Sequence, residues 1–278
     1  MEQTTKGTFV TPELTVDELS KALYNVTQSL QQSNELLLKS QEQQEEFFSN
    51  ISHDLRSPIA ALRSSVEYLQ TYKDLDFNEC MQIYAIMMKK ITYMEQMIND
   101  IFLLSTLETK QRKLHLVDLP IGDFLEDYFF TCKQDPTYND CDLHFTPPKD
   151  LPFLVRIDTA LLVRVLNNLF TNAIKYSEGI PYIELSAILY QSDKVLVTVE
   201  DHGIGIATEN LNRIFDRSYM VSTARSPSAA GNGLGLSIAK SIVQLHDGSI
   251  WCKSKQGKGS SFCFTLPINK LKGVENHE

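Results

Sequence analysis

From about Val16 to Tyr72 the sequence contains no glycine, and its only proline is Pro58. Helix interiors disfavour these two residues most, so the stretch predicts one long helix. Apolar residues recur in it at heptad spacing: Leu19, Leu23, Val26, Leu30, Leu37, Phe47 and Ile51. Such a stripe has to be buried against other helices, which limits this part of the chain to a coiled coil or a helical bundle.

A second helical pattern runs from about residue 78 to 108, after the break KDLDFN. Its apolar stripe consists of Ile83, Met87, Ile91, Met94, Ile98 and Ile101. Two helices with apolar seams and a short connection form an antiparallel hairpin. Because one hairpin cannot bury its own seam well, we expect a homodimer through residues 47–110, with a four-helix bundle in the dimer.

After Lys113 the composition changes to aromatic and β-branched segments separated by proline and glycine. Period-two patterns predict strands at residues 183–189, 194–200, 249–253 and 260–266, and helical patterns lie at 158–176 and 234–246. The expected fold class is therefore multidomain: an all-α dimeric helical hairpin followed by an α+β domain.

Composition narrows the function. A net charge of −9 argues against nucleic acid as a partner, since phosphate backbones require clusters of lysine and arginine. Five scattered cysteines indicate reduced thiols in a cytosolic protein. No apolar run approaches the ~18 residues of a membrane span, and no signal peptide is visible, so we expect the chain as given to be cytoplasmic.

The helix predicted at 158–176 carries a polar stripe opposite its apolar face: Arg164, Asn168, Asn172 and Lys175. Two amide oxygens and a cation on one face could hold Mg²⁺ and neutralise phosphates. A solvated polar face explains the same stripe equally well.

Two glycine patterns follow this helix. Asp201 ends a predicted strand and is followed by Gly203 and Gly205, where a carboxylate could accept from an amino group such as adenine N6. Further on, GNGLGL runs from Gly231 into a helix, and such a loop presents backbone N–H groups to phosphate. The small, polar stretch between Phe215 and Gly231 is typical of a lid.

His53 lies about 200° from the seam of the first helix, so we expect it to face solvent. An exposed histidine usually has no special role. This one adjoins Asp54 and precedes Pro58, a residue that costs about 3 kcal/mol inside a helix and kinks it.

The order of these patterns resembles the bacterial two-component sensor histidine kinases. SHDLRSP is similar to their H box, residues 168–176 to the N box, residues 201–205 to the G1 box, Ile214-Phe215 to the F box, and residues 231–236 to the G2 box. The resemblance covers about residues 47–268.

The resemblance implies a two-layer α/β sandwich ATP-binding domain, of the type shared with heat-shock chaperones, topoisomerases and mismatch-repair ATPases. Asn168 and Asn172 would coordinate Mg²⁺, Lys175 would contact phosphate, Tyr176 would pack on the base and Asp201 would read adenine. The remaining ATP-binding residues that it implies are Gly203, Gly205, Phe215, Arg217, Gly231, Gly233, Leu234, Gly235 and Leu236.

The implied reaction is autophosphorylation of His53 by Mg-ATP, followed by transfer of the phosphoryl group to an aspartate of a response regulator. Asp54 would accept a proton from the imidazole or orient it. The chain departs from the family at Ser57, where threonine or asparagine is tied to phosphatase activity. It also departs after the F box, where the family often has an arginine and this chain has Tyr219-Met220, so that Arg217 or Arg225 would serve the γ-phosphate instead.

These assignments give a domain layout. Residues 1–15 form a lead-in, 16–46 a signalling helix or coiled coil, 47–110 the dimerisation and phosphotransfer domain, 111–116 a linker, 117–270 the ATP-binding domain and 271–278 a tail. The first helix is similar to the end of a HAMP module, which implies an upstream transmembrane sensor, with the full-length protein in the bacterial inner or plasma membrane and this portion cytoplasmic.

Two other functions fit part of the pattern. A chaperone- or topoisomerase-like ATPase shares the asparagine and glycine motifs, but it does not need His53 and Asp54 on a dimeric hairpin. A non-catalytic coiled-coil adaptor with a vestigial nucleotide site is disfavoured by the intact Asn172, Asp201 and Gly203.

Overall fold

The computed structural model describes residues 15–72, 74–108, 113–148, 154–191, 193–217, 219 and 233–269. The chain divides into two units, Met1–Ser52 and His53–Glu278. Several predicted segments lie outside the described residues: the lead-in before residue 15, the tail, and the lid between Phe215 and Gly231 except for Asp216, Arg217 and Tyr219. Arg225 is part of that lid.

Helix α1 (Val16–Thr71) confirms the long helix predicted from the absence of glycine. In the first unit its apolar stripe is exposed, at residues such as Leu23, Leu30 and Leu37. Helix α2 (Phe77–Glu108) begins at a reciprocal capping box. The Glu79 backbone N–H donates to Asp76 Oδ1 at 2.7 Å, and the Asp76 N–H donates to Glu79 Oε2 at 3.1 Å.

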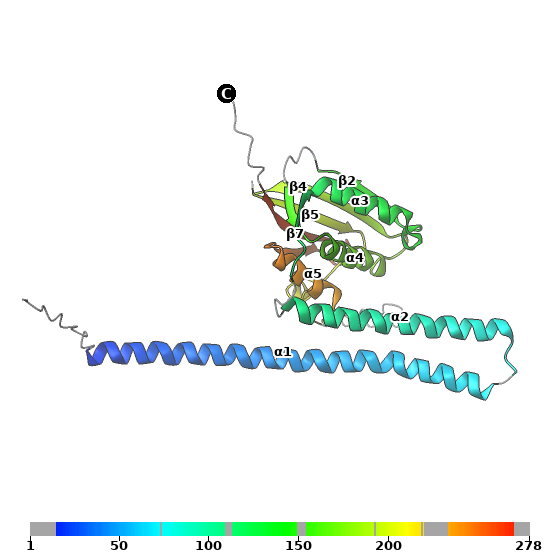
Figure 1. Cartoon of the computed structure of the whole chain (residues 1–278), viewed down its shortest axis with the longest axis horizontal. Coiled ribbons are helices and arrows are strands. Elements are labelled where there is room, and N and C mark those ends of the chain that lie inside the picture. The colour runs from blue at the N-terminus through cyan, green and yellow to red at the C-terminus, as the bar shows by residue number, and fades with distance from the viewer. Residues whose placement is uncertain are drawn as a thin grey trace, which may run out of the picture. The chain divides into compact units, whose positions relative to one another are not determined.

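In the second unit, the end of α1 from His53 onward and α2 form the predicted antiparallel hairpin (Figure 1). One member of the predicted apolar stripe of α2 is exposed in the single chain. Ile98 is 56% exposed, whereas its neighbour Met97 is 1% exposed. The reason is that α2 also packs against helix α5 (Gly235–Leu245), so its second half has an apolar face on another side.

The α+β domain is built on a sheet in the order β1-β3-β7-β5-β4-β2, with β6 also paired to β7. The strands are β1 (Val117–Pro120), β2 (Asp142–Thr146), β3 (Leu154–Ile157), β4 (Tyr182–Tyr190), β5 (Lys194–Asp201), β6 (Ile250–Ser254) and β7 (Ser260–Asn269). Only β2 and β4 pair in parallel.

Helices α3 (Ile121–Gln134), α4 (Thr159–Lys175) and α5 lie on one face of this sheet (Figure 1). Strand β5 shows why: Val195, Val197 and Val199 are buried under the helices, while the alternate residues are only half-buried. Two short 3₁₀ turns, η1 (Pro136–Tyr138) and η2 (Thr208–Asn210), complete the elements. The predicted two-layer α/β fold is therefore correct.

Helix α4 is fixed at its N-terminus by Asp158. The Asp158 side chain accepts from the Leu161 N–H at 3.2 Å, as an N-cap does, and from the His115 N–H at 3.1 Å. The Asp158 N–H donates to Nε2 of His246, at the end of α5, at 2.9 Å. These bonds tie the start of α4 to the end of α5, and so hold the two helices that carry the candidate site.

The helices in the described part of the chain do not meet the requirements of a membrane span. None of them is both long enough and apolar enough to cross a bilayer.

Candidate active site

A cavity of about 280 Å³ lies against the polar face of α4. Its walls are Tyr93, Gln96, Met97, Asp100, Asn168, Thr171, Asn172, Lys175, Tyr176, Ile214, Tyr219, Gly233, Gly235 and Leu236. The structure thus brings together the residues predicted from the N box and the described part of the G2 box. The predicted residues Asp201, Gly203, Gly205, Phe215, Arg217 and Leu234 are not among its walls, and Gly231 lies outside the described residues.

Asn168 links α4 to the start of α5. Its Nδ2 donates to the Gly235 carbonyl at 2.9 Å. A Cβ atom at Gly235 would lie 3.3 Å from Asn168 Oδ1, so a larger residue there would press on this amide. The contact sets the distance between the two motifs, and it also occupies part of the hydrogen-bonding capacity of Asn168.

Asn172 is available for a ligand. It is half-buried and lines the cavity, and its amide makes no hydrogen bond to any residue that the structure describes. One turn later, Lys175 Nζ lies 4.8 Å from the centre of the Tyr176 ring. A free amide oxygen and a cation therefore face the same cavity.

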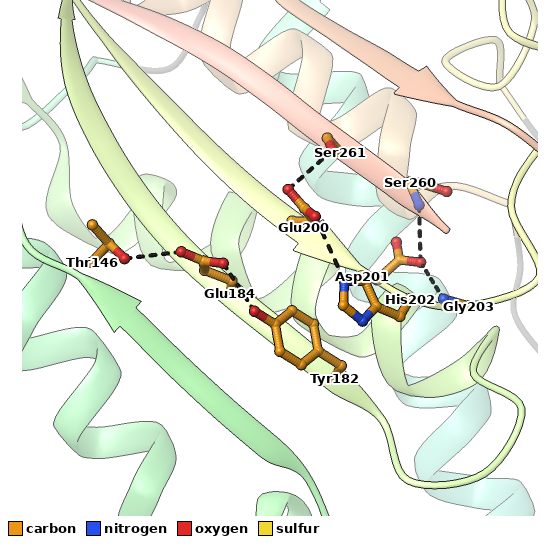
Figure 2. A network of polar contacts seen from close by, with 9 residues as sticks. All are labelled: Thr146, Tyr182, Glu184, Glu200, Asp201, His202, Gly203, Ser260 and Ser261. Carbon is orange, nitrogen blue, oxygen red and sulfur yellow. Dashed lines mark hydrogen bonds and ion pairs between the residues drawn. The ribbon is translucent and has the colours of Figure 1, made fainter. Parts of the chain in front are cut away.

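Asp201 lies at the end of β5 (Figure 2). It is buried, as are the alternate valines of this strand. Its Oδ1 accepts from the backbone N–H groups of Gly203, at 2.9 Å, and Ser260, at 3.2 Å. Among the described residues, no donor reaches Oδ2. Burial raises the pKa of this carboxyl, and the two backbone N–H groups and the charge of His202 oppose the rise.

The loop after Asp201 fits closely against the end of α4. The Ile204 N–H donates to the Tyr176 carbonyl at 3.0 Å. A Cβ atom at Gly203 would lie 2.4 Å from the same carbonyl oxygen, so glycine is required there. Although Asp201 is not a wall of the cavity, this loop places it directly beside Tyr176, which is one.

The start of α5 completes the phosphate side of the cavity. Gly233 has a φ of 66°, a left-handed conformation that favours glycine. Leu234 is fully buried, and Leu236 lines the cavity in the first turn of α5. Backbone N–H groups at the first turn of a helix have no partner within the helix, so they are suited to phosphate.

The F box contributes through Ile214, which is buried and lines the cavity. Phe215 is half-buried, and Arg217 is exposed. The cavity is lined instead by Tyr219, whose hydroxyl donates to Asn210 Oδ1 at 2.8 Å and whose ring lies under Arg213 at 4.4 Å. The sequence noted Tyr219 only as a departure from the family.

Helix α2 provides a wall that the sequence did not predict. Tyr93, Gln96, Met97 and Asp100 are spaced at three or four residues and line the cavity together. Asp100 is buried and pairs with Arg164 on α4, whose Nε is buried without a hydrogen-bond partner among the described residues. The sequence feature that could have predicted this wall is Asp100 itself, an aspartate within the apolar run at the end of this helix.

His53 lies on α1 with its side chain 81% exposed, as the seam predicted. Its Nδ1 lies 3.4 Å from Asp54 Oδ1, and its Nε2 makes no bond to any described residue. Ser57 is exposed one turn later. Burial raises the pKa of the Tyr93 phenol, and the charge of Asp54 raises it further. Tyr93 lines the cavity, so a residue of the cavity is influenced by the charge next to His53.

The oxygen donors at the cavity suit Mg²⁺. Among the described residues, no group of three or more histidine, cysteine, aspartate or glutamate side chains could hold a metal ion. The free Asn172 amide lines a cavity of about 280 Å³. This arrangement fits a hard cation that takes its other oxygens from nucleotide phosphates and water.

Two families match the chain. Residues 43–110 match the His Kinase A (phospho-acceptor) domain. Residues 157–270 match the histidine kinase-, DNA gyrase B-, and HSP90-like ATPase domain.

Curated relatives extend the match. The sensor histidine kinase WalK of Bacillus subtilis is 32% identical over 92% of this chain and 40% of its own length. A sensor protein kinase WalK of Staphylococcus aureus is 30% identical over 81% of the chain and 54% of its own length. The chain spans about half or less of the length of these relatives.

Solved structures share the fold. The histidine kinase ThkA in complex with response regulator protein TrrA has a TM-score of 0.64 at 22% identity, covering 82% of this chain and 63% of that one. The Acinetobacter baumannii histidine kinase AdeS has a TM-score of 0.59 at 21% identity, covering 78% of this chain and 98% of that one. With both domains matched in order, the chain belongs to the two-component sensor histidine kinases.

Proposed function

We propose that the chain transfers the γ-phosphoryl group of ATP to His53 and passes it to an aspartate of a response regulator. The observation that carries this proposal is the state of the His53 imidazole. Asp54 lies at Nδ1, and Nε2 is exposed and unbonded within the described residues. If Nδ1 carries the proton toward Asp54, the lone pair of Nε2 is free to attack.

The step is an in-line displacement. A bond forms between His53 Nε2 and the γ-phosphorus as the bond from that phosphorus to the bridging oxygen of ADP breaks. The Nδ1 proton is held or accepted by Asp54, which stabilises the charge that develops on the ring. Lys175 and the N–H groups at the start of α5 neutralise the leaving phosphates.

The residues present fit a magnesium ion, with the Asn172 amide oxygen as its first protein ligand and Asn168 as the second predicted one. Since Asn168 also donates to Gly235, Asn172 is the stronger candidate. When bound, the ion neutralises phosphate charge. For the base, Asp201 Oδ2 accepts from the adenine amino group and Tyr176 packs beside it.

The partners follow from the reaction and the family. We propose a homodimer through residues 47–110 and a receiver domain that docks on the exposed faces of α1 and α2 near His53. One solved relative is a kinase in complex with a response regulator. We further propose that the chain acts on the cytoplasmic side of a bacterial membrane, downstream of a membrane sensor, where ATP is present and its five unpaired cysteines stay reduced.

Incubation with γ-labelled ATP and Mg²⁺ tests the proposal. We expect the wild-type chain to be labelled and to lose the label to a receiver domain. His53→Gln should remove the label, because amide nitrogen is not a nucleophile at neutral pH. His115→Gln is the matched control, since this side chain is also exposed and only its backbone is bonded. Equal labelling of His53→Gln would contradict the proposal.

A further inference from the structure

A buried charge pair joins α2 to the ATP-binding domain. Asp100 of α2 is 6% exposed, in the half of the helix where Met97 and Leu104 are also buried. Its carboxylate pairs with the guanidinium of Arg164 on α4. A carboxylate is taken out of water only where a partner compensates for its lost hydration. Asp100 and Arg164 therefore have to meet whenever α2 and α4 are packed in this way.

The pair is built to open as well as to close. The Arg164 side chain is 33% exposed, yet its Nε is buried with no hydrogen-bond partner among the described residues. If α4 leaves α2, both charged groups return to water, which supplies the missing hydrogen bond. The attraction within a buried pair is largely offset by the desolvation of its two members. The contact therefore selects one docked arrangement without making it permanent.

In this docked arrangement the nucleotide cavity lies against α2. Four of its walls come from this helix: Tyr93, Gln96, Met97 and Asp100. None of its walls comes from the described part of α1, the helix that carries His53. Transfer requires the γ-phosphorus to come within reach of His53 Nε2, in line with the bond that breaks. A cavity walled by α2 alone does not meet this requirement.

Bound nucleotide would act on the pair through its charge. Asp100 lines the cavity together with Asn172 and Lys175, where the phosphates are expected. Phosphates at this place repel the Asp100 carboxylate and attract the Arg164 guanidinium, so they pull the two partners apart. Docking on α2 and occupancy by a triphosphate therefore oppose each other, and by linkage each weakens the other.

We propose that the Asp100–Arg164 pair is an autoinhibitory latch, which holds the nucleotide cavity against α2 and opens before phosphoryl transfer to His53. This regulation rests on the proposed kinase function. The latch is a contact between two domains of one chain, so any change that separates α2 from α4 would release it. Its strength then sets the fraction of chains that are free to transfer.

Two single substitutions separate a latch from a direct effect of charge on the nucleotide. Asp100→Asn removes a negative charge from the cavity and Arg164→Met removes a positive charge near it, so direct effects on phosphate have opposite signs. A latch predicts the same sign for both. Each variant leaves one buried charge without its partner, which destabilises the docked arrangement.

Initial rates of labelling by γ-labelled Mg-ATP, measured on the full chain, test this. We expect Asp100→Asn and Arg164→Met each to be labelled about fivefold faster than the wild type, at the lower end of usual coupling between sites. Asp100→Leu combined with Arg164→Met replaces the pair by an apolar contact and should return the rate toward the wild-type value. Glu95→Gln, at an exposed acid on the same helix, should follow the wild type. X-ray scattering in solution without nucleotide should give a larger radius of gyration for both single variants.

Three results would overturn the latch. One is a rate that rises in Asp100→Asn and falls in Arg164→Met, which is the signature of a direct charge effect. Another is slower labelling of both, which would make the docked arrangement the one that transfers. The third is an unchanged radius of gyration in both single variants. If neither the wild type nor any variant were labelled, the proposed kinase function would fall and the autoinhibitory role with it, while the scattering would still report whether the pair holds the domains together.

Discussion

Asn168 and Asn172 lie one turn apart on α4, yet their amides are in different states. Asn168 donates to the Gly235 carbonyl, whereas the Asn172 amide has no partner among the described residues. The sequence predicted both as equal magnesium ligands, since spacing cannot show which amide the fold itself uses. The environment of Asp201 could not be predicted either. Its place at the end of a strand predicted its role, but the Ser260 N–H that donates to its carboxylate comes from a strand distant in sequence.

Asn172→Ala tests the metal role at this scale. We expect affinity for Mg-ATP to fall by roughly two orders of magnitude, because a hard cation loses its protein oxygen and no other described amide replaces it. Equilibrium dialysis with labelled nucleotide measures this. Asn99→Ala, in an exposed position on α2, should bind as the wild type does. Unchanged affinity in Asn172→Ala would refute the assignment.

Gly205→Ala tests the fit of the loop after Asp201. Gly205 has a φ of 65°, and its Cβ atom would lie 2.2 Å from the Lys255 carbonyl oxygen. Strain and displacement together should cost about 2–4 kcal/mol in the free energy of unfolding and weaken nucleotide binding. Gly257→Ala is the control: its φ is 76° but nothing lies within 4 Å, so about 1 kcal/mol is expected. Equal losses in urea denaturation would contradict the argument.

The elements that position the site were predictable where their periodicity was strong. Strand β5 alternates along its eight residues, β4 and β7 are nine and ten residues long, and α4 and α5 have broad apolar faces. Strands β1, β2 and β3 were missed because each has only four or five residues, too few to show a clear period, and β1 ends in a proline. Helix α3 was missed because the strands before and after it in the chain were not predicted either, so nothing marked where a helix should begin or end.

Asp158→Ala tests the anchoring of α4. The variant loses the cap on Leu161 and the bond from His115, so the free energy of unfolding should fall by about 1–2 kcal/mol. Urea denaturation followed by circular dichroism gives this value. Asp127→Ala on α3 is the control, because its side chain is exposed and unbonded, and its effect should stay within about 0.5 kcal/mol. An equal effect of both variants would show that the cap does not stabilise α4.

For the whole molecule, α2 has two roles. One face continues the hairpin, and another lines the cavity and pairs Asp100 with Arg164. Only the first role could be predicted, since one heptad stripe describes one interface and cannot show that a second domain packs on the same helix. The exposed apolar residues that remain on the hairpin then require a partner. They include Ile59, Met88, Ile98 and Phe102.

The proposed dimer would bury these exposed side chains. Ile98 and Phe102 are one turn apart on α2, and Phe102 is 70% exposed. The double variant Ile98→Asp, Phe102→Asp should shift the mass measured by light scattering from dimer to monomer, because charge cannot be buried in the bundle. Ile180→Asp, at a 77% exposed residue of the ATP-binding domain, should remain a dimer. A double variant that stays dimeric would place the interface elsewhere.

The central claim is that bound ATP phosphorylates the His53 imidazole, and the chemistry of the product tests it most directly. The labelled chain is treated with acid and with alkali, and the labelled peptide is sequenced by mass spectrometry. A phosphoramidate on His53 predicts a label that acid removes, that alkali leaves in place, and that resides on the peptide containing His53. An acid-stable label on another residue, or ADP release with no label on the protein, would contradict the account and favour a conformational ATPase.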